Sequence, residues 1–293
     1  MDNSHFSAVC FGEVLWDILP DKKLPGGAPM NVAYHLNQLG IPAAMISRIG
    51  DDALGRELIA YFTSKKVAGD FIQTDPDHDT SRVLAKVEGN RVTYDIVKPV
   101  AWDFIACNER IEKAVAAARF FIFGSLGVRS EVSRNTLYKL LEIAHVKVLD
   151  INLRPPHYGK NTLEYLLQKA SLLKLNDEEL QLLSGWYGWQ SDEKEAMKAL
   201  QDKFRLNTII TTRGENGAIA LHDGAFYEHP GFKVQVVDTI GSGDAFLAGF
   251  ISGLFEERLL PEVLEFAGKM GAFMATHAGA CPQYQVADVR ELK

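Results

Sequence analysis

Short hydrophobic runs alternate with longer amphipathic segments along this chain. Pro29 stands in the first turn of a helix-like segment over 29–39, and Gly40 and Pro42 follow it, as is typical of a helix start and stop. Because strands separated by helices predict a mostly parallel sheet with helices on both faces, we expect an α/β fold. The runs read as strands cover residues 7–11, 43–49, 120–123, 146–151, 172–175 and 208–212.

One region breaks this alternation and predicts a second, smaller sheet. Residues 81–97 alternate between apolar and polar positions around Gly89-Asn90, a favoured two-residue hairpin turn. Residues 14–19 could pair with this hairpin. We therefore expect a single domain over 1–293, with a small β-sheet lid formed by about 13–28 and 71–103.

Composition and charge narrow the class of protein. The chain has 293 residues, of which 47% are hydrophobic, and 31 Lys and Arg stand against 38 Asp and Glu. This is ordinary globular composition, and the net charge of −7 disfavours a nucleic-acid partner. No apolar run approaches the ~18 residues of a membrane span. Three distant cysteines and no visible signal peptide favour a cytoplasmic protein.

The strongest chemical motif is Gly241-Ser242-Gly243-Asp244. It follows an apolar run, read as a strand, that ends at Asp238, and it precedes an almost wholly apolar helix expected to begin near Asp244. Glycines let backbone amides approach a ligand, and a helix N-terminus attracts phosphate. A carboxylate there could accept the proton of an attacking alcohol. The alternative is that Asp244 is a helix cap.

Other phosphate-binding motifs do not fit the chain. The turn lacks the third glycine of the dinucleotide fingerprint, and neither a Walker A loop nor the kinase motif H-R-D occurs. The glycine turn therefore predicts a phosphate site of another class.

A second glycine pair, Gly26-Gly27, precedes Pro29 and Asn31. Its backbone could lie against a flat polar ligand, and the Asn31 amide offers both a donor and an acceptor. The alternative is a plain strand-to-helix turn, which glycines often mark.

Asp17 shares its alternation face with Leu15 and Leu19. A carboxylate on an apolar face needs hydrogen-bonding partners. Sugar hydroxyls would supply them, and a structural lysine is the alternative.

Two segments together resemble a known family. Residues 238–246 (DTIGSGDAF) closely resemble the C-terminal signature of the ribokinase-like (PfkB) carbohydrate kinases, and residues 26–33 (GGAPMNVA) resemble the N-terminal one. The resemblance implies a ribokinase-like fold with Asp244 as catalytic base. It also implies an anion hole formed by the backbone of residues 241–244, that is, of Gly241, Ser242, Gly243 and Asp244.

The same resemblance assigns the sugar-binding residues. It implies that the Asp17 carboxylate, the Gly26 and Gly27 backbone and the Asn31 amide bind sugar hydroxyls. Arg154, in Asp-x-Asn-x-Arg after the strand over 146–151, could neutralise phosphate charge. A surface salt bridge is the alternative for Arg154.

Two further segments are assigned to the nucleotide. Asn176 and Glu179 read as a capping box, and they also match the family's N-x-x-E motif, which implies Mg²⁺ held largely through water. Residues 212–217 resemble the family's T-x-G-x-x-G segment, which assigns Thr212, Gly214 and Gly217 to ATP. Asp238 and the backbone at Ile240 match one side of a K⁺ site, for which residues 275–284 could supply the other.

The choice of sugar rests on resemblance alone. Residues 11–18, the Gly-Gly-Ala-Pro-x-Asn loop, Gly124-Ser125 and Asp-x-Asn-x-Arg are together most similar to fructokinases. This implies that β-D-fructose and ATP give fructose 6-phosphate and ADP, with transfer to the 6-hydroxyl. The alternatives are a 2-keto-3-deoxygluconate kinase, a ribokinase-type activity and a non-catalytic sugar sensor.

The expected partners are a small sugar and ATP. Since the small β lid has exposed edges, it could also pair with a second copy and form a homodimer.

Overall fold

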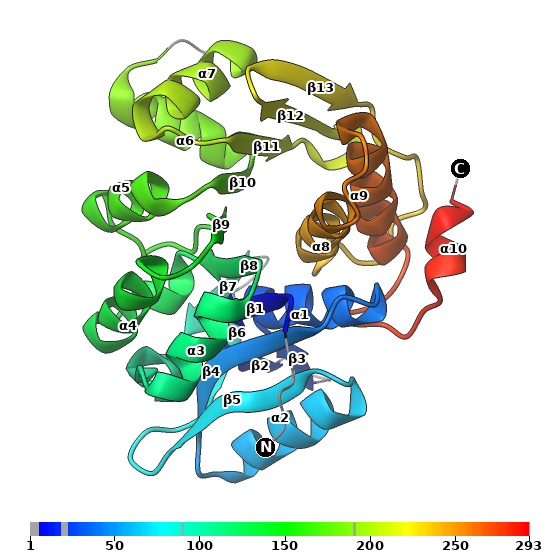
Figure 1. The fold of residues 1–293 in the computed structure, drawn as a ribbon. Coiled ribbons are helices and arrows are strands. Elements are labelled where there is room, and N and C mark those ends of the chain that lie inside the picture. The colour runs from blue at the N-terminus through cyan, green and yellow to red at the C-terminus, as the bar shows by residue number, and fades with distance from the viewer. Residues whose placement is uncertain (1–5, 19–22, 89–90, 190–191, 293) are drawn as a thin grey trace.

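A computed structural model describes residues 6–18, 23–88, 91–189 and 192–292. Within them, a nine-stranded sheet runs in the order β13-β12-β11-β10-β9-β8-β1-β4-β5 (Figure 1). All neighbouring pairs from β11 to β5 are parallel, and β12 and β13 are added antiparallel. The strands are β1 (Ala8–Phe11), β4 (Ala43–Gly50), β5 (Ala68–Asp75), β8 (Phe120–Gly124), β9 (Val146–Asp150), β10 (Leu172–Asn176), β11 (Thr208–Thr212), β12 (Ala218–His222) and β13 (Ala225–His229).

Helices cover both faces of this sheet, so the prediction of an α/β fold is confirmed. Their apolar residues form two separate clusters, one against each face. One face carries α3 (Glu109–Ala117), α4 (Glu131–Leu141), α5 (Lys160–Lys169), α6 (Asp177–Tyr187) and α7 (Glu193–Phe204). The other carries α1 (Ala28–Gln38), α2 (Ala53–Ser64), α8 (Ser242–Phe255), α9 (Leu260–Ala275) and α10 (Val286–Arg290) (Figure 1).

Local signals explain where several of these elements begin and end. The Asp52 side chain accepts the amide of Gly55 and caps α2. Gly40 has φ +80° directly after α1, a conformation that favours glycine. Short 3₁₀ turns complete the chain: η1 (Ala101–Phe104), η2 (Leu126–Val128) and η3 (Gly214–Asn216). Among the described helices, none combines the length and apolarity that a membrane crossing requires.

A separate four-stranded sheet forms from two chain segments. Its strands are β2 (Leu15–Ile18), β3 (Lys23–Gly26), β6 (Ser81–Glu88) and β7 (Arg91–Ile96), in the order β3-β2-β6-β7. The predicted hairpin is present as the antiparallel pair β6–β7, and its Gly89-Asn90 turn lies outside the described residues.

The expected start of the second lid segment, at residue 71, was wrong. Phe71 pairs in register with Ile46, and residues 71–75 finish β5 of the large sheet. Phe71 is 7% exposed and belongs to the core of the large domain. This apolar contact against β4 keeps the segment out of the small sheet, whose second part begins at Ser81.

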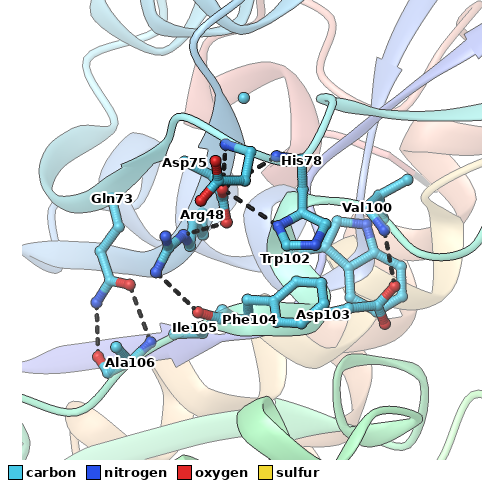
Figure 2. Close-up of polar contacts among 12 residues, drawn as sticks. Arg48, Gln73, Asp75, His78, Val100, Trp102, Asp103, Phe104, Ile105 and Ala106 are labelled. Carbon is cyan, nitrogen blue, oxygen red and sulfur yellow. Dashed lines mark hydrogen bonds and ion pairs between the residues drawn. The ribbon is translucent and has the colours of Figure 1, made fainter.

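A polar cluster links the segments before β6 and after β7 to the large sheet, and Figure 2 shows its contacts. The Arg48 guanidinium forms an ion pair with Asp75 at 2.7 Å, and it donates to the Phe104 carbonyl at 3.0 Å. Asp75 also accepts the backbone amide of His78 at 3.0 Å, and the His78 ring stacks on Phe104. Since His78 precedes β6 and Phe104 follows β7, the base of the small sheet is fixed on β4.

The strand expected to end at Asp238 was also wrong. Residues 230–241 have no strand pairing, and Val236 and Val237 are 58% and 64% exposed. Their backbone connects instead to α9, because the amides of Val237 and Asp238 both donate to the Ala275 carbonyl. The apolar run therefore lies across the end of a helix rather than inside the sheet.

Candidate active site

The turn that begins α8 depends on a glycine. Gly241 is the N-cap residue and has φ +78°, and a Cβ at this position would lie 2.6 Å from the Ala280 Cβ. Both the backbone angle and the close neighbour exclude a larger residue. The helix α8 that follows is buried along Asp244–Gly253. The turn is therefore fixed by this buried helix and by its contact with Ala280.

Backbone donors gather at this helix start. The Ser242 amide donates to the Thr239 carbonyl at 3.2 Å and is thereby engaged. Gly243 and Asp244 lie in the first turn, where a helix has no acceptor for its own amides. Together with the helix dipole, these two N–H groups form a place for an anion.

Asp244 is a buried carboxylate held by Asn31. It is 9% exposed, and the Asn31 Nδ2 donates to its Oδ2 at 2.7 Å. Burial and the charge of Asp150 raise the pKa of Asp244 to about 6, although Lys174 and the Asn31 hydrogen bond oppose the shift. Asp244 does not cap the helix, since that place belongs to Gly241. It can accept a proton near neutral pH.

An ion pair absent from our sequence predictions lies beside Asp244. Lys174 of β10 donates from Nζ to both oxygens of Asp150 on β9, at 2.9 Å each. Both residues are buried, and the Lys174 Nζ would lie 3.2 Å from a Cβ on Gly243. Burial opposes the Lys174 charge, but Asp150 and Asp244 outweigh it and raise the pKa of Lys174. A permanent cation therefore lies next to the helix start.

Among the described residues, no lysine pairs with Asp17, the structural alternative to sugar binding. No hydrogen bond or ion pair joins the Asp17 side chain to another of the described residues. Its Oδ2 would lie 2.7 Å from a Cβ on Gly26, so this carboxylate lies directly against the glycine backbone. Burial raises the pKa of Asp17, and the Arg154 charge lowers it in part. A half-buried carboxylate with free acceptor sites is suited to bind hydroxyl donors.

Glu13 is a second residue that we did not predict from the sequence. It is 4% exposed, its Oε1 accepts the Ala28 amide at 3.3 Å, and its backbone packs against Gly27. Gly27 has φ +123°, and a Cβ there would lie 2.4 Å from the Glu13 carbonyl oxygen. Burial raises the pKa of Glu13 to about 7. The available signal was a charged residue two positions after the predicted strand over 7–11.

Arg154 has no carboxylate partner among the described residues, so the salt-bridge alternative finds no support. Its Nη1 donates to the Leu153 carbonyl at 3.0 Å, and the residue is exposed. Its charge lowers the pKa values of Glu13, Asp17 and Asp244. The guanidinium thus faces carboxylates of both the Asp17 region and the α8 start.

Asn176 and Glu179 form the predicted capping box. The Asn176 Oδ1 accepts the Glu179 amide at 2.8 Å, and the Glu179 Oε2 accepts the Asn176 amide at 2.9 Å. The Glu179 Oε1 accepts the Leu153 amide at 2.7 Å. Burial raises the pKa of Glu179, opposed by the Asn176 hydrogen bond. Glu179 thus joins α6 to the loop that carries Arg154.

The predicted nucleotide turn follows β11 directly. Gly214 and Gly217 have φ +57° and φ +78°, and Gly214 has open space where a Cβ would lie. The Thr212 Oγ1 lies 3.5 Å from the Leu175 carbonyl at the adjacent end of β10. A ligand can therefore approach the Gly214 backbone beside the Asn176 cap, whereas Gly217 packs closely against residues 229–231.

Asp238 holds two loops together through its side chain. Its two carboxylate oxygens accept the amides of Ile240 and Gly279, at 3.0 and 3.1 Å. The described residues contain no group of three or more His, Cys, Asp or Glu side chains that could hold a metal. Asp238 therefore fixes the segment after α9 against the turn that precedes α8.

Comparison with known proteins identifies the family. The profile of the pfkB family carbohydrate kinases matches residues 9–286. The chain belongs to this family, and it is a carbohydrate kinase. A fructokinase from Klebsiella pneumoniae is 30% identical over 92% of this chain and 93% of its own length. A probable fructokinase-7 from Arabidopsis thaliana is 29% identical over 96% and 90%.

Solved structures share the fold along the whole chain. A fructokinase from Xylella fastidiosa with bound ATP has a TM-score of 0.86 at 22% identity, with 97% of each chain covered. A Vibrio cholerae fructokinase mutant with fructose, ADP and potassium has a TM-score of 0.83 at 23% identity, with 100% and 99% covered. At these identities the likeness shows a ribokinase-like fold.

Proposed function

We propose that this kinase is a fructokinase, which transfers the γ-phosphate of ATP to the 6-hydroxyl of D-fructose. The observation that carries the proposal is the buried Asp244 carboxylate, held at 2.7 Å by Asn31 in the first turn of α8. A carboxylate with a raised pKa is a general base for an alcohol, and the adjacent helix start suits a phosphoryl group. The choice of fructose follows the fructokinases among the relatives.

The acceptor sugar would lie between the small sheet and α8. The Asp17 carboxylate has no hydrogen-bond or ion-pair partner among the described residues, and the Gly26 backbone lies against it. These groups, with Asn31, would bind sugar hydroxyls and direct one of them to Asp244. The Asp244 carboxylate accepts the proton as the hydroxyl oxygen attacks the γ-phosphorus. The bond from that phosphorus to the bridging oxygen breaks, and ADP leaves.

The nucleotide phosphates would lie over the α8 start. The free amides of Gly243 and Asp244 would stabilise the charge of the transferred group, and Lys174 adds a buried cation. Arg154 lies on the side of the sugar acceptor, and its positive charge would also neutralise charge on the transferred phosphoryl group. The backbone turn formed by Thr212, Gly214 and Gly217 would hold the remaining phosphates and the ribose.

The residues fit a magnesium ion that keeps its water shell. Both Glu179 oxygens already accept backbone amides, so a direct bond would compete with the capping box. Each oxygen retains a second acceptor site, which suits a water ligand. Asn176 and Glu179 would hold the ion through water, and the ion would neutralise phosphate charge. We also propose a K⁺ site near Asp238. The Asp238 carboxylate accepts the amides of Ile240 and Gly279, and the loops held in this way would surround the ion.

We also propose that the open edges of the small sheet, β3 and β7, pair with a second copy of the chain. An unpaired strand edge is a template for such pairing. Light scattering across a wide concentration range tests this, and a monomeric mass throughout would contradict it.

The decisive experiment is ADP release with Mg-ATP and a panel of acceptors: fructose, ribose, 2-keto-3-deoxygluconate and adenosine. We expect the highest kcat/KM with fructose. Faster turnover of another acceptor would replace fructose and leave the kinase mechanism in place. Sugar binding without any ADP release would instead favour a non-catalytic sensor.

A further inference from the structure

A cavity of about 240 Å³ lies beside the acceptor side of the site. Its lining includes four basic residues, Lys98, Arg129, Arg134 and His157, together with Ser125. The chain as a whole carries a net charge of −7. A concentration of cations in one hollow of an acidic protein therefore needs a physical reason.

One of these cations is fully used by the fold. Arg129 binds both oxygens of Asp103, at 2.8 and 2.9 Å, and donates to the Ile96 and Val97 carbonyls. Its side chain is 1% exposed and stacks on Trp102. Arg129 therefore forms part of the cavity wall, and the charge of Asp103 behind it offsets its own.

The other cations have no acidic partner among the described residues. Lys98 and Arg134 make only long contacts of 3.5 Å, from Lys98 Nζ to the Arg129 carbonyl and from Arg134 Nη1 to the Val128 carbonyl. Neither forms an ion pair with a described carboxylate. Their N–H groups are therefore free to bind an anion that enters the cavity.

His157 responds to the positive charge of this hollow. Burial lowers the pKa of His157, and the charges of Arg129 and Lys98 lower it further, although Asp103 and Asp95 oppose them. A bound anion would reverse this effect, because it would stabilise the imidazolium. His157 would then become a third cationic donor.

The chain itself joins the cavity to the acceptor side. The His157 amide donates to the Arg154 carbonyl at 2.8 Å, so one tight turn carries both Arg154 and the cavity residue His157. Ser125 is 3% exposed, lines the cavity, and its Oγ has no partner within the described part of the chain. Ser125 also lines a small hollow next to Glu13. A ligand here would touch groups that border the acceptor site.

We propose that this cavity is a second subsite, which binds the phosphate or carboxylate group of a small molecule through Lys98, Arg134 and His157. The anion is either one end of an acidic acceptor or a free metabolite that binds beside a neutral sugar. The proposal does not depend on which sugar the enzyme phosphorylates, and its first test requires no turnover.

The first test titrates inorganic phosphate into the protein by calorimetry at constant ionic strength. The variants are the double substitution Lys98→Gln/Arg134→Gln and, as a matched control, Arg56→Gln, whose ion pair with Asp51 is highly exposed. We expect the double variant to lose about tenfold or more in phosphate affinity, since each charge-assisted hydrogen bond contributes strongly. The control should bind as the wild type does.

The NMR signal of the His157 ring gives an independent measurement. Phosphate should raise the pKa of His157 in the wild type and leave it unchanged in the double variant. Absence of phosphate binding at millimolar concentrations would overturn the proposal. Equal binding by wild type and double variant would also overturn it, because the anion would then occupy another place such as the α8 start.

Kinetics separate the two sources of the anion. If the anion belongs to the acceptor, the double variant raises KM for 2-keto-3-deoxygluconate about tenfold and leaves KM for fructose unchanged. If the anion is a free metabolite, phosphate changes the fructose kinetics of the wild type but not of the double variant. Either result supports the subsite. If the double substitution changes neither the KM for 2-keto-3-deoxygluconate nor the effect of phosphate on the fructose kinetics, the cavity is not an anion subsite.

Discussion

The substitution Asp244→Asn isolates proton transfer from every other function of the site. Asparagine has nearly the same shape, and its side-chain oxygen can still accept the 2.7 Å hydrogen bond from Asn31. Lys174 keeps its two bonds to Asp150, so no buried cation loses its partner. We therefore expect the variant to fold and to bind sugar normally.

The expected loss in turnover follows from the ionisation of Asp244. With a pKa of about 6, roughly nine-tenths of Asp244 is carboxylate at pH 7, so the wild type uses nearly its full base. A positioned general base contributes about 10²–10⁴-fold to rate. The amides of Gly243 and residue 244 remain in the variant, as does Lys174. We expect kcat to fall about 10²–10⁴-fold, with KM for fructose changed by less than a few-fold.

The assay couples ADP release to NADH oxidation and is paired with calorimetric titration of fructose. Asp17→Asn is the matched control, since it removes one carboxylate of similar size on the acceptor side. That control should raise KM for fructose more than it lowers kcat. Turnover of Asp244→Asn within tenfold of the wild type, with sugar affinity intact, would refute the assignment of Asp244 as base.

Three further changes test the surroundings of this base. The acid limb of kcat should lie near pH 6, because activity needs the Asp244 carboxylate and burial raises its pKa to about 6. Asn31→Ala removes a hydrogen bond that stabilises this carboxylate, so the limb should move to higher pH in a pH–rate profile. Lys174→Met leaves Asp150 buried and unpaired and should cost about 3–5 kcal/mol in denaturant unfolding, of which Asp150→Asn in the same chain should recover part. Gly241→Ala places a side chain at φ +78° and should cost at least about 1–2 kcal/mol in thermal unfolding, with a loss of kcat; wild-type stability would show that the turn can relax.

Local sequence signals were enough for most of the architecture. The strands over 120–123 and 208–212 were predicted from β-branched and aromatic runs, and they extend by at most one residue in the structure. The helix predicted over 29–39 is displaced by a single residue as Ala28–Gln38. Such elements are set by periodicity and by their end signals, both of which are local.

The missed features depend on contacts between distant segments. Val236 and Val237 look like a strand, but they pair with no strand in the described part of the chain, and the end of α9 accepts the Val237 amide instead. Lys174 stands alone in the apolar run LLKLN, and its partner Asp150 lies 24 residues earlier, directly opposite in the parallel register. A lone charge within a buried strand signals that a partner exists, but only the register names it.

The register of β9 and β10 also explains why the proposed base, Asp244, keeps a raised pKa beside a buried lysine. Three buried carboxylates, Asp150, Asp244 and Glu179, surround the buried cation Lys174. Lys174 is bound to Asp150 at 2.9 Å through both oxygens, so it only partly compensates Asp244. If Lys174 were bound to Asp244 instead, the pKa of that carboxyl would fall and the base would weaken. The pairing across β9 and β10 therefore keeps a cation close to the α8 start, where we propose that the phosphoryl group binds, while it leaves Asp244 basic enough for the proposed proton transfer.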